Sequence, residues 1–325
     1  MNDELISIRG QQYVVIRRFR VDGKLLLAVS QLKSRGREAY RVFDQGTRQW
    51  RALHLFPFTP STVQHLRTLQ RITRGDNEVI QILHIGRHKG RTLVLLPWID
   101  GFNLGVVLRR QRTSKRRIGL AEAIRLLKGI VHCLSHLHRR KGIVHADVKP
   151  SNLILTQRSS LVLIDYGSAW SRERTTQKEE GDGVSPGYAA PELIRGNTTV
   201  DWRADQFSVG VILYELLTGK LPYGGLGGSA ARFEMSLFDK TLHTYPSRLS
   251  PEMGSYSKRI WKEVDELASR SLALEPCSRF LTEAEWLDAW SSVAAQLALT
   301  KKRVANRRPS LKRIPLYLVD VLFRR

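Results

Sequence analysis

Alternating apolar and polar positions occupy the first hundred residues of the chain. Residues 25–32, 38–44 and 50–55 alternate at the period of a strand, and turns that contain Gly and Asp separate them. Residues 79–85 and 91–99 predict two further strands, and residues 13–19 predict an accessory strand ahead of the others. The pattern therefore predicts a β-rich N-terminal region.

Helical spacing dominates after residue 119. Ile124, Leu127, Val131 and Leu134 recur at intervals of three and four, which predicts an amphipathic helix after Gly119. Residues 207–217 are almost continuously apolar and predict a buried helix, which the Gly-containing segment 219–224 ends. A further helix is expected at 282–297, so the second region is mainly helical.

Length and charge narrow the class of protein. A chain of 325 residues, 42% hydrophobic, can bury a large core and excludes disorder throughout. The net charge of +23 at pH 7 either attracts acidic or phosphate-rich partners or reflects solvated Arg and Lys faces. From Thr300 onward, nine Lys and Arg residues accompany one acid, Asp320. This basic tail is a possible contact for an acidic partner, but we see no motif for specific nucleic-acid recognition.

The cysteines and the N-terminus indicate the compartment. Cys133 and Cys277 lie far apart in the sequence, which predicts neither a disulfide framework nor a zinc site. Early acids and the lack of an apolar core at the N-terminus do not fit a secretory signal. No apolar run is long enough to span a bilayer, so we expect no transmembrane segment and a cytoplasmic location.

The candidate chemistry is concentrated in one loop, residues 145–152. It carries an acid, a lysine and an amide, Asp147, Lys149 and Asn152, between apolar segments. Asp165 follows the short apolar run 161–164 and precedes Gly167, a position that suits a metal ligand better than a core residue. Phosphoryl transfer needs such a set, with a base for the hydroxyl, a cation for the moving group and oxygen ligands for Mg²⁺.

These two segments resemble the H-R-D-L-x-x-x-N and D-F-G signatures of the protein kinase family. Lys149, two residues after Asp147, resembles the lysine found at this position in the Ser/Thr-directed branch of the family. The resemblance implies an α+β, two-lobed kinase-like fold. Asp147 and Lys149 would act on the substrate hydroxyl and the γ-phosphoryl group of ATP, while Asn152 and Asp165 would hold Mg²⁺. Ser185, in a segment that resembles T-P-x-Y-x-A-P-E, would line the substrate site.

Three further positions of the large lobe follow from the resemblance. Asp205 would hold the catalytic-loop backbone, and Arg279 would pair with Glu192 of the A-P-E-like segment. Ala146 replaces the family's arginine that receives an activation-loop phosphate. We therefore expect Thr175 and Thr176 not to be activating phosphorylation sites.

The nucleotide lobe departs from the family pattern. The glycine-rich loop is replaced by residues 32–37, and His54, next to Ala52, stands where the family has its strand lysine. Residues 61–74 resemble the αC helix, with Ser61 or Thr62 as cap, but contain no acid to pair with that lysine. Arg37 resembles the substitute cation of the With-No-Lysine kinases, and a protonated His54 is a second candidate. Lys33, on the same loop, is expected to contact the nucleotide. The alternatives are a solvent-facing Arg37 and a neutral core His54.

Leu96, Trp98 and Ile99 resemble the hinge that holds adenine, although core packing also explains Leu96 and Trp98. The expected organisation is an extension or accessory strand at 1–23, a small lobe at 24–98, a large lobe at 99–299 and the basic tail at 300–325. Two functions remain open. One is a Ser/Thr protein kinase that uses ATP and Mg²⁺ with unusual nucleotide anchoring. The other is a pseudokinase that serves as a binding scaffold.

Overall fold

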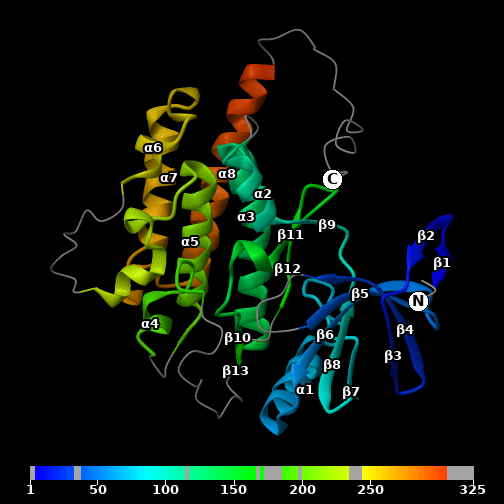
Figure 1. Ribbon diagram of the computed structural model, residues 1–325. Helices are drawn as coiled ribbons and strands as arrows, with labels where there is room; N and C mark the ends of the chain where they lie inside the picture. The colour runs from blue at the N-terminus through cyan, green and yellow to red at the C-terminus, as the bar shows by residue number, and fades with distance from the viewer. Residues whose placement is uncertain are drawn as a thin grey trace.

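The computed structural model describes residues 4–32, 38–113, 117–165, 169–171, 185–196, 200–233 and 244–305. The predicted α+β, two-lobed fold is confirmed, with a curled antiparallel sheet in the small lobe and a helical large lobe (Figure 1). The strands are β1 (Leu5–Ile8), β2 (Gln11–Val14), β3 (Arg17–Val21), β4 (Lys24–Leu32), β5 (Glu38–Asp44), β6 (Gln49–Pro57), β7 (His84–His88), β8 (Arg91–Pro97), β9 (Gly101–Asn103), β10 (Ile143–Val144), β11 (Leu153–Thr156), β12 (Leu161–Leu163) and β13 (Trp170–Ser171).

The α-helices are α1 (Pro60–Thr73), α2 (Leu104–Gln111), α3 (Leu120–His136), α4 (Pro191–Ile194), α5 (Arg203–Thr218), α6 (Pro246–Leu249), α7 (Lys258–Ser271) and α8 (Glu283–Ala305). A π-helical turn, η1 (Leu137–Lys141), continues α3. Short 3₁₀ turns are η2 (Pro150–Asn152), η4 (Tyr223–Gly225), η5 (Gly227–Arg232), η7 (Met253–Ser255) and η8 (Pro276–Ser278).

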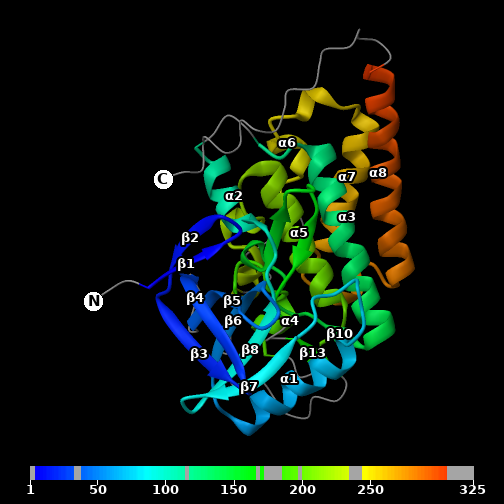
Figure 2. The ribbon, with the colours of Figure 1, turned by 90° about the vertical axis from the view of Figure 1, so that its right-hand side faces the viewer.

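The small-lobe sheet has six antiparallel strands in the order β3-β4-β5-β6-β8-β7. Its two outer strands, β3 and β7, contact each other, so the sheet curls almost into a barrel (Figure 2). Alternation along each strand then divides the side chains between two faces. Leu53, Leu55 and their neighbours Leu93 and Leu95 fill the inside of the curl with Phe19.

The other face of this sheet turns toward the rest of the molecule. Val94, opposite His54 in the ladder, belongs to the large core that also contains Leu66 and Leu69 of α1 and most of α3. The register places Ala52 between Arg41 and Leu96, and His54 between Ala39 and Val94. Directly opposed residues share a face, so the predicted nucleotide residues Ala52, His54 and Leu96 lie on this face.

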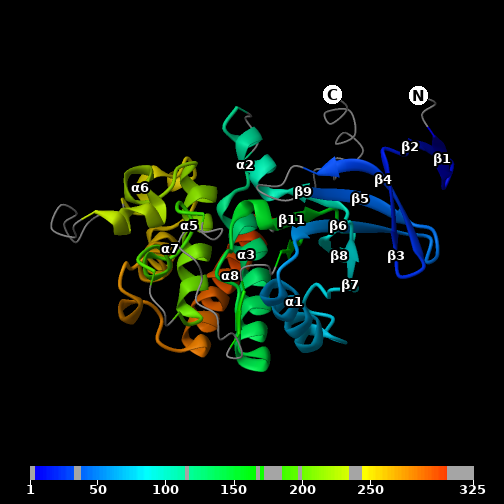
Figure 3. The ribbon, with the colours of Figure 1, turned by 60° about the horizontal axis from the view of Figure 1, so that its bottom comes forward.

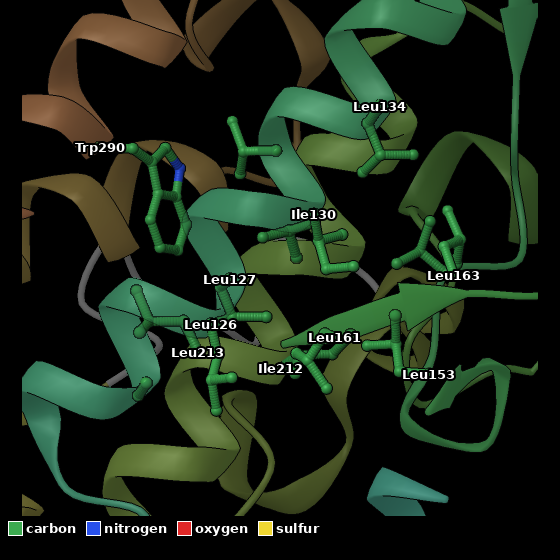
Figure 4. Close-up of a cluster of buried hydrophobic side chains, with 14 of the residues drawn as sticks. Leu126, Leu127, Ile130, Leu134, Leu153, Leu161, Leu163, Ile212, Leu213 and Trp290 are labelled. Carbon is green, nitrogen blue, oxygen red and sulfur yellow. The ribbon is translucent and has the colours of Figure 1, made fainter. Parts of the chain in front are cut away.

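The large lobe is built around α3 and α5. Figure 4 shows Leu127, Ile130 and Leu134 of α3 packed with Ile212 and Leu213 of α5, Trp290 of α8, and leucines of β11 and β12. Every residue of α5 after Arg203 is buried, as its apolar sequence predicted. Figure 3 shows that β11 and β9 lie between this helical layer and the small-lobe sheet. The short sheet β12-β11-β9 thereby connects the core to the catalytic loop.

Three local predictions were wrong. The expected strand at 79–85 is absent, because Val79, Ile80 and Ile82 instead pack into the core without a ladder, and β7 begins only at His84. Thr59, rather than Ser61 or Thr62, caps α1, since its hydroxyl accepts from the Thr62 N–H at 3.1 Å. Segment 4–21 forms three strands instead of one.

Candidate active site

Asp205 fixes the backbone of the catalytic loop. Its carboxylate, at the first turn of α5, accepts hydrogen bonds from the N–H groups of His145 at 2.9 Å and Ala146 at 2.8 Å. Ala146 has a left-handed φ of 60°, which turns the chain toward Asp147. The role predicted for Asp205 is confirmed. Burial alone would raise the Asp205 pKa, but the hydrogen bond from His138 and the loop contacts hold it below its usual range.

The loop brings three predicted catalytic residues together. The Lys149 ammonium lies 2.9 and 2.7 Å from the two Asp147 carboxylate oxygens and 2.9 Å from the Ser185 hydroxyl. The Asn152 side-chain N–H₂ donates to the Asp147 backbone carbonyl at 2.9 Å and to its carboxylate at 3.1 Å. Asp147 is thus held in one orientation beside a cation and a hydroxyl that comes from a distant segment.

Asp165 is placed next to Asn152 by strand pairing. β11 and β12 pair antiparallel, and the Ile164 N–H donates to the Asn152 backbone carbonyl at 2.8 Å. Asp165 follows directly with a left-handed φ of 67°, and its side chain is partly exposed. The negative charges of Asp165 and Asp147 each raise the pKa of buried His145, against the larger effect of burial. The strand end therefore delivers Asp165 to the same region as Asp147 and Asn152.

The donor set at this position fits Mg²⁺. Within the described ranges, no cluster of three or more His, Cys, Asp or Glu side chains is arranged to hold a metal by itself. Mg²⁺ usually takes only one or two protein carboxylates and completes its shell with water and substrate phosphate. Because the Asn152 amide nitrogen is engaged with Asp147, its side-chain oxygen is the atom that can act as a ligand beside Asp165.

Three of the predicted nucleotide residues, His54, Leu96 and Ile99, contact apolar side chains. The His54 ring stacks on Phe56 with centroids 6.3 Å apart, and both residues are half-buried. Leu96 and Ile99 pack against the large core. The sequence of α1 contains no acid, so no Lys–Glu type pair can form between this helix and β6.

Trp98 is engaged by an arginine that the sequence did not single out. The Arg41 guanidinium lies 4.8 Å from the Trp98 ring centre and 4.1 Å from that of Trp50, and the Trp98 N–H donates to Asp100 at 2.8 Å. Two aromatic faces at such distances make a cation–π stack. Lys33 and Arg37, as well as Thr175 and Thr176, lie outside the described residues.

A family model described as "Protein kinase domain" matches residues 59–290, which is more than half of the chain. The chain belongs to the protein kinase family. The matched stretch begins at the cap of α1 and contains the whole catalytic loop, Asp165 and Ser185. Strands β1 to β6 precede the matched stretch, and β6 carries Ala52 and His54.

Several curated relatives are named as Ser/Thr protein kinases. The chain is 37% identical over 161 residues to "Serine/threonine-protein kinase AtPK1/AtPK6" of Arabidopsis thaliana, covering 48% of this chain and 32% of the relative. It is 26% identical over 216 residues to "Serine/threonine-protein kinase PknJ" of Mycobacterium bovis, covering 65% of this chain and 34% of the relative. The aligned part thus spans about a third of the length of these relatives. Among the described residues of the kinase, no helix combines the length and apolar character needed to cross a bilayer.

The kinase also contains the predicted buried ion pair of the large lobe. Arg279 donates two hydrogen bonds to Glu192, at 2.7 and 2.8 Å, and both side chains are at most 5% exposed. Arg279 further donates to the backbone carbonyls of Arg203 and Ala273. The pair therefore joins α4, α5 and the segment before η8, and the sequence prediction for Glu192 and Arg279 is confirmed.

Two buried interactions escaped the sequence analysis. His138 contacts Asp205 at 2.8 Å, and Glu215 accepts from the Tyr188 hydroxyl at 2.6 Å and from Arg112 at 3.2 Å. Glu215 lies in an apolar helix 27 residues from Tyr188 and 103 residues from Arg112. Glu215 is the single charge within the apolar stretch 207–217, and it was the available signal, because an acid is buried only when it has partners.

Proposed function

We propose that this chain is a Ser/Thr protein kinase that transfers the γ-phosphoryl group of ATP to a protein hydroxyl. The observation that carries the proposal is the contact of Lys149 with both Asp147 and Ser185. A carboxylate that accepts a hydroxyl proton and a cation that stabilises the transferring group must lie side by side for this reaction. Packing alone does not require the same lysine to join these two distant segments.

Asp147 acts on the acceptor hydroxyl in this proposal. The Asn152 amide and Lys149 ammonium hold its carboxylate in place, so one of its oxygens can accept the hydroxyl hydrogen and orient the attacking oxygen. Lys149 remains close enough to stabilise negative charge on the transferring group. Bound Mg²⁺, held by the side-chain oxygens of Asn152 and Asp165, would neutralise phosphate charge and align the nucleotide.

Nucleotide anchoring is the unusual part of the proposed kinase. Ala52, Leu96, Trp98 and Ile99 would contact the adenine, since they lie on or beside the sheet face that turns toward the large core. His54, together with Lys33 or Arg37, would supply the positive charge that a strand lysine usually supplies. The substrate is a protein Ser or Thr, as Ser185 and the following segment imply.

The test is phosphate transfer from labelled ATP with Mg²⁺ to a basic and an acidic generic protein substrate. We expect Asp147→Asn and Asp165→Asn each to reduce the rate by about 10²–10⁴-fold, because each removes a positioned catalytic or metal-binding oxygen. Asp288→Asn, on the exposed face of α8, is the matched control and should leave the rate unchanged.

A pseudokinase is the second candidate, and the acid-free α1 together with His54 favours it. Nucleotide binding without transfer would support this scaffold role. Transfer that persists in both Asn variants would assign the activity to a contaminant. If the wild-type protein shows neither binding nor transfer, the enzyme proposal fails.

A further inference from the structure

A cavity of about 200 Å³ lies between the end of α2, the connection to α3 and the C-terminal end of α5. It is smaller than the roughly 300–1,000 Å³ typical of small-molecule sites, so its size suits one side chain of a larger ligand. Its polar lining consists mostly of charged groups. They are Arg112, Arg117, Glu215 and Lys220.

The single acid of this cavity is already paired. One Glu215 oxygen accepts from Arg112 at 3.2 Å, and the other accepts from the Tyr188 hydroxyl at 2.6 Å. Glu215 is only 4% exposed, so its charge faces these partners rather than solvent. Burial and, to a smaller extent, the hydrogen bond to Glu215 raise the pKa of the Tyr188 hydroxyl, which keeps it protonated as a donor. An incoming cation would have to displace both partners.

Two cations at the cavity remain without an ion-pair partner among the described residues. Arg117 and Lys220 are exposed, and both line the cavity together with Gly219, the left-handed cap of α5. The charges of Arg112 and Glu215 cancel each other, so Arg117 and Lys220 give the lining a net charge of about +2. The carbonyl end of α5 offsets roughly half a charge. The cavity is therefore positive even after the helix dipole is included.

The cavity is connected to the candidate acceptor site through one segment of chain. The Tyr188 N–H donates to the Ser185 carbonyl at 2.9 Å, and the Ser185 hydroxyl contacts Lys149. The Tyr188 side chain leads from there to Glu215 at the cavity. The segment 185–188 therefore contacts both Lys149 of the candidate acceptor site and Glu215 of the cavity.

We propose that this cavity binds an acidic or phosphorylated side chain of the substrate, a few residues from the acceptor hydroxyl. The inference rests on the proposed function for the identity of its ligand. Carboxylate and phosphate oxygens accept strong hydrogen bonds from Arg and Lys. The chain's net charge of +23 would also favour the approach of such a substrate.

Binding of acceptor-free peptides tests the proposal without any need for catalysis. Fluorescent alanine–glycine peptides would carry one phosphoserine, aspartate or arginine at successive positions, and anisotropy would report the dissociation constant of the full chain. We expect phosphoserine or aspartate at one position to tighten binding about tenfold over alanine, since charged hydrogen bonds are made. The gain should fall as salt rises.

Matched double variants separate the cavity from the general positive charge of the protein. Arg117→Ala with Lys220→Ala should abolish the gain. Arg109→Ala with Lys262→Ala removes the same charge from exposed positions outside the cavity and should preserve it. A preference for arginine, an equal loss in both double variants or no positional preference would overturn the proposal. If the acidic preference is found but no peptide with a serine is phosphorylated, the enzyme proposal alone fails.

Discussion

At the residue scale, His145 links the catalytic loop to pH. Its side chain is fully buried, and burial lowers its pKa below the usual value of 6.5 even though Asp205, Asp147 and Asp165 oppose the shift. The unfolded chain therefore binds a proton that the folded state rejects. Stability is complete above the unfolded pKa near 6.5 and decreases as the pH falls toward the folded pKa.

We expect urea unfolding of the wild type to show this loss between pH 7 and pH 5. One such group changes the free energy of unfolding by at most about 1.4 kcal/mol per pH unit. His145→Asn should flatten the slope in this range. An unchanged slope in the variant would assign the effect to other groups, such as His88, whose pKa burial also lowers.

The proximity of Asp147, Lys149 and Asn152 could be predicted from the sequence, because they lie within six positions of one another. Asp165 could also be predicted, since a short apolar strand leads directly to it. The Glu215 contacts could not, because they depend on how α2 and the Ser185 segment pack against α5. Arg41 escaped for the same reason: its aromatic partners come from β6 and the end of β8.

At the element scale, two glycines predict opposite effects of the same substitution. A Cβ at Gly86 of β7 would collide with the Val21 side chain on β3, and Val21 is buried. Gly129, in an exposed position within α3, has open space around its Cβ position. The first glycine permits close approach of two strands, whereas the second only weakens a helix.

We therefore expect Gly86→Ala to destabilise the protein by about 1–3 kcal/mol through overpacking. Gly129→Ala should stabilise it by about 0.5–1 kcal/mol, because alanine restricts the unfolded chain and favours the helix. Equilibrium unfolding in urea measures both. If Gly86→Ala did not destabilise the protein, β3 and β7 would not lie in contact in solution.

Element prediction succeeded where one face of an element is apolar. The helix after Gly119 begins where it was predicted, and the strand at 38–44 has the predicted bounds, since α3 and β5 each bury a regular set of side chains. The prediction failed for the first part of the run at 79–85. Val79, Ile80 and Ile82 are as apolar as strand residues, but they pack into the large core and belong to no strand. Only the tertiary arrangement distinguishes the two cases.

At the scale of the whole molecule, a cluster of charges joins the two lobes. Asp76, just after α1, contacts His136 of α3 at 2.6 Å and Lys141 of η1 at 3.2 Å. Burial opposes the charge, but these two partners and the Glu78 N–H hold the Asp76 pKa below its usual range. The contact therefore stabilises the junction of the two lobes above pH 4, and this stabilisation is lost as the pH falls further.

Asp76→Asn should cost about 1–3 kcal/mol, because His136 and Lys141 lose a charged partner. We also expect faster amide hydrogen exchange in residues 76–83 and at the end of α3 than in the wild type. Asp22→Asn, at a mostly exposed carboxylate on the sheet, is the control. Uniform acceleration over both lobes would indicate global destabilisation instead of a loosened junction.

The closure of the small-lobe sheet by β3 has a practical consequence for preparing this protein. Phe19 and Val21 fill the inside of the curl, so an expression product that starts at Lys24 would leave Leu26, Tyr40 and Leu93 open to water. Such a product would also lose the strand that contacts β7 and would present two unprotected edges to other molecules. Shortened versions should therefore begin ahead of Arg17, or they will tend to aggregate before any enzymatic measurement is possible.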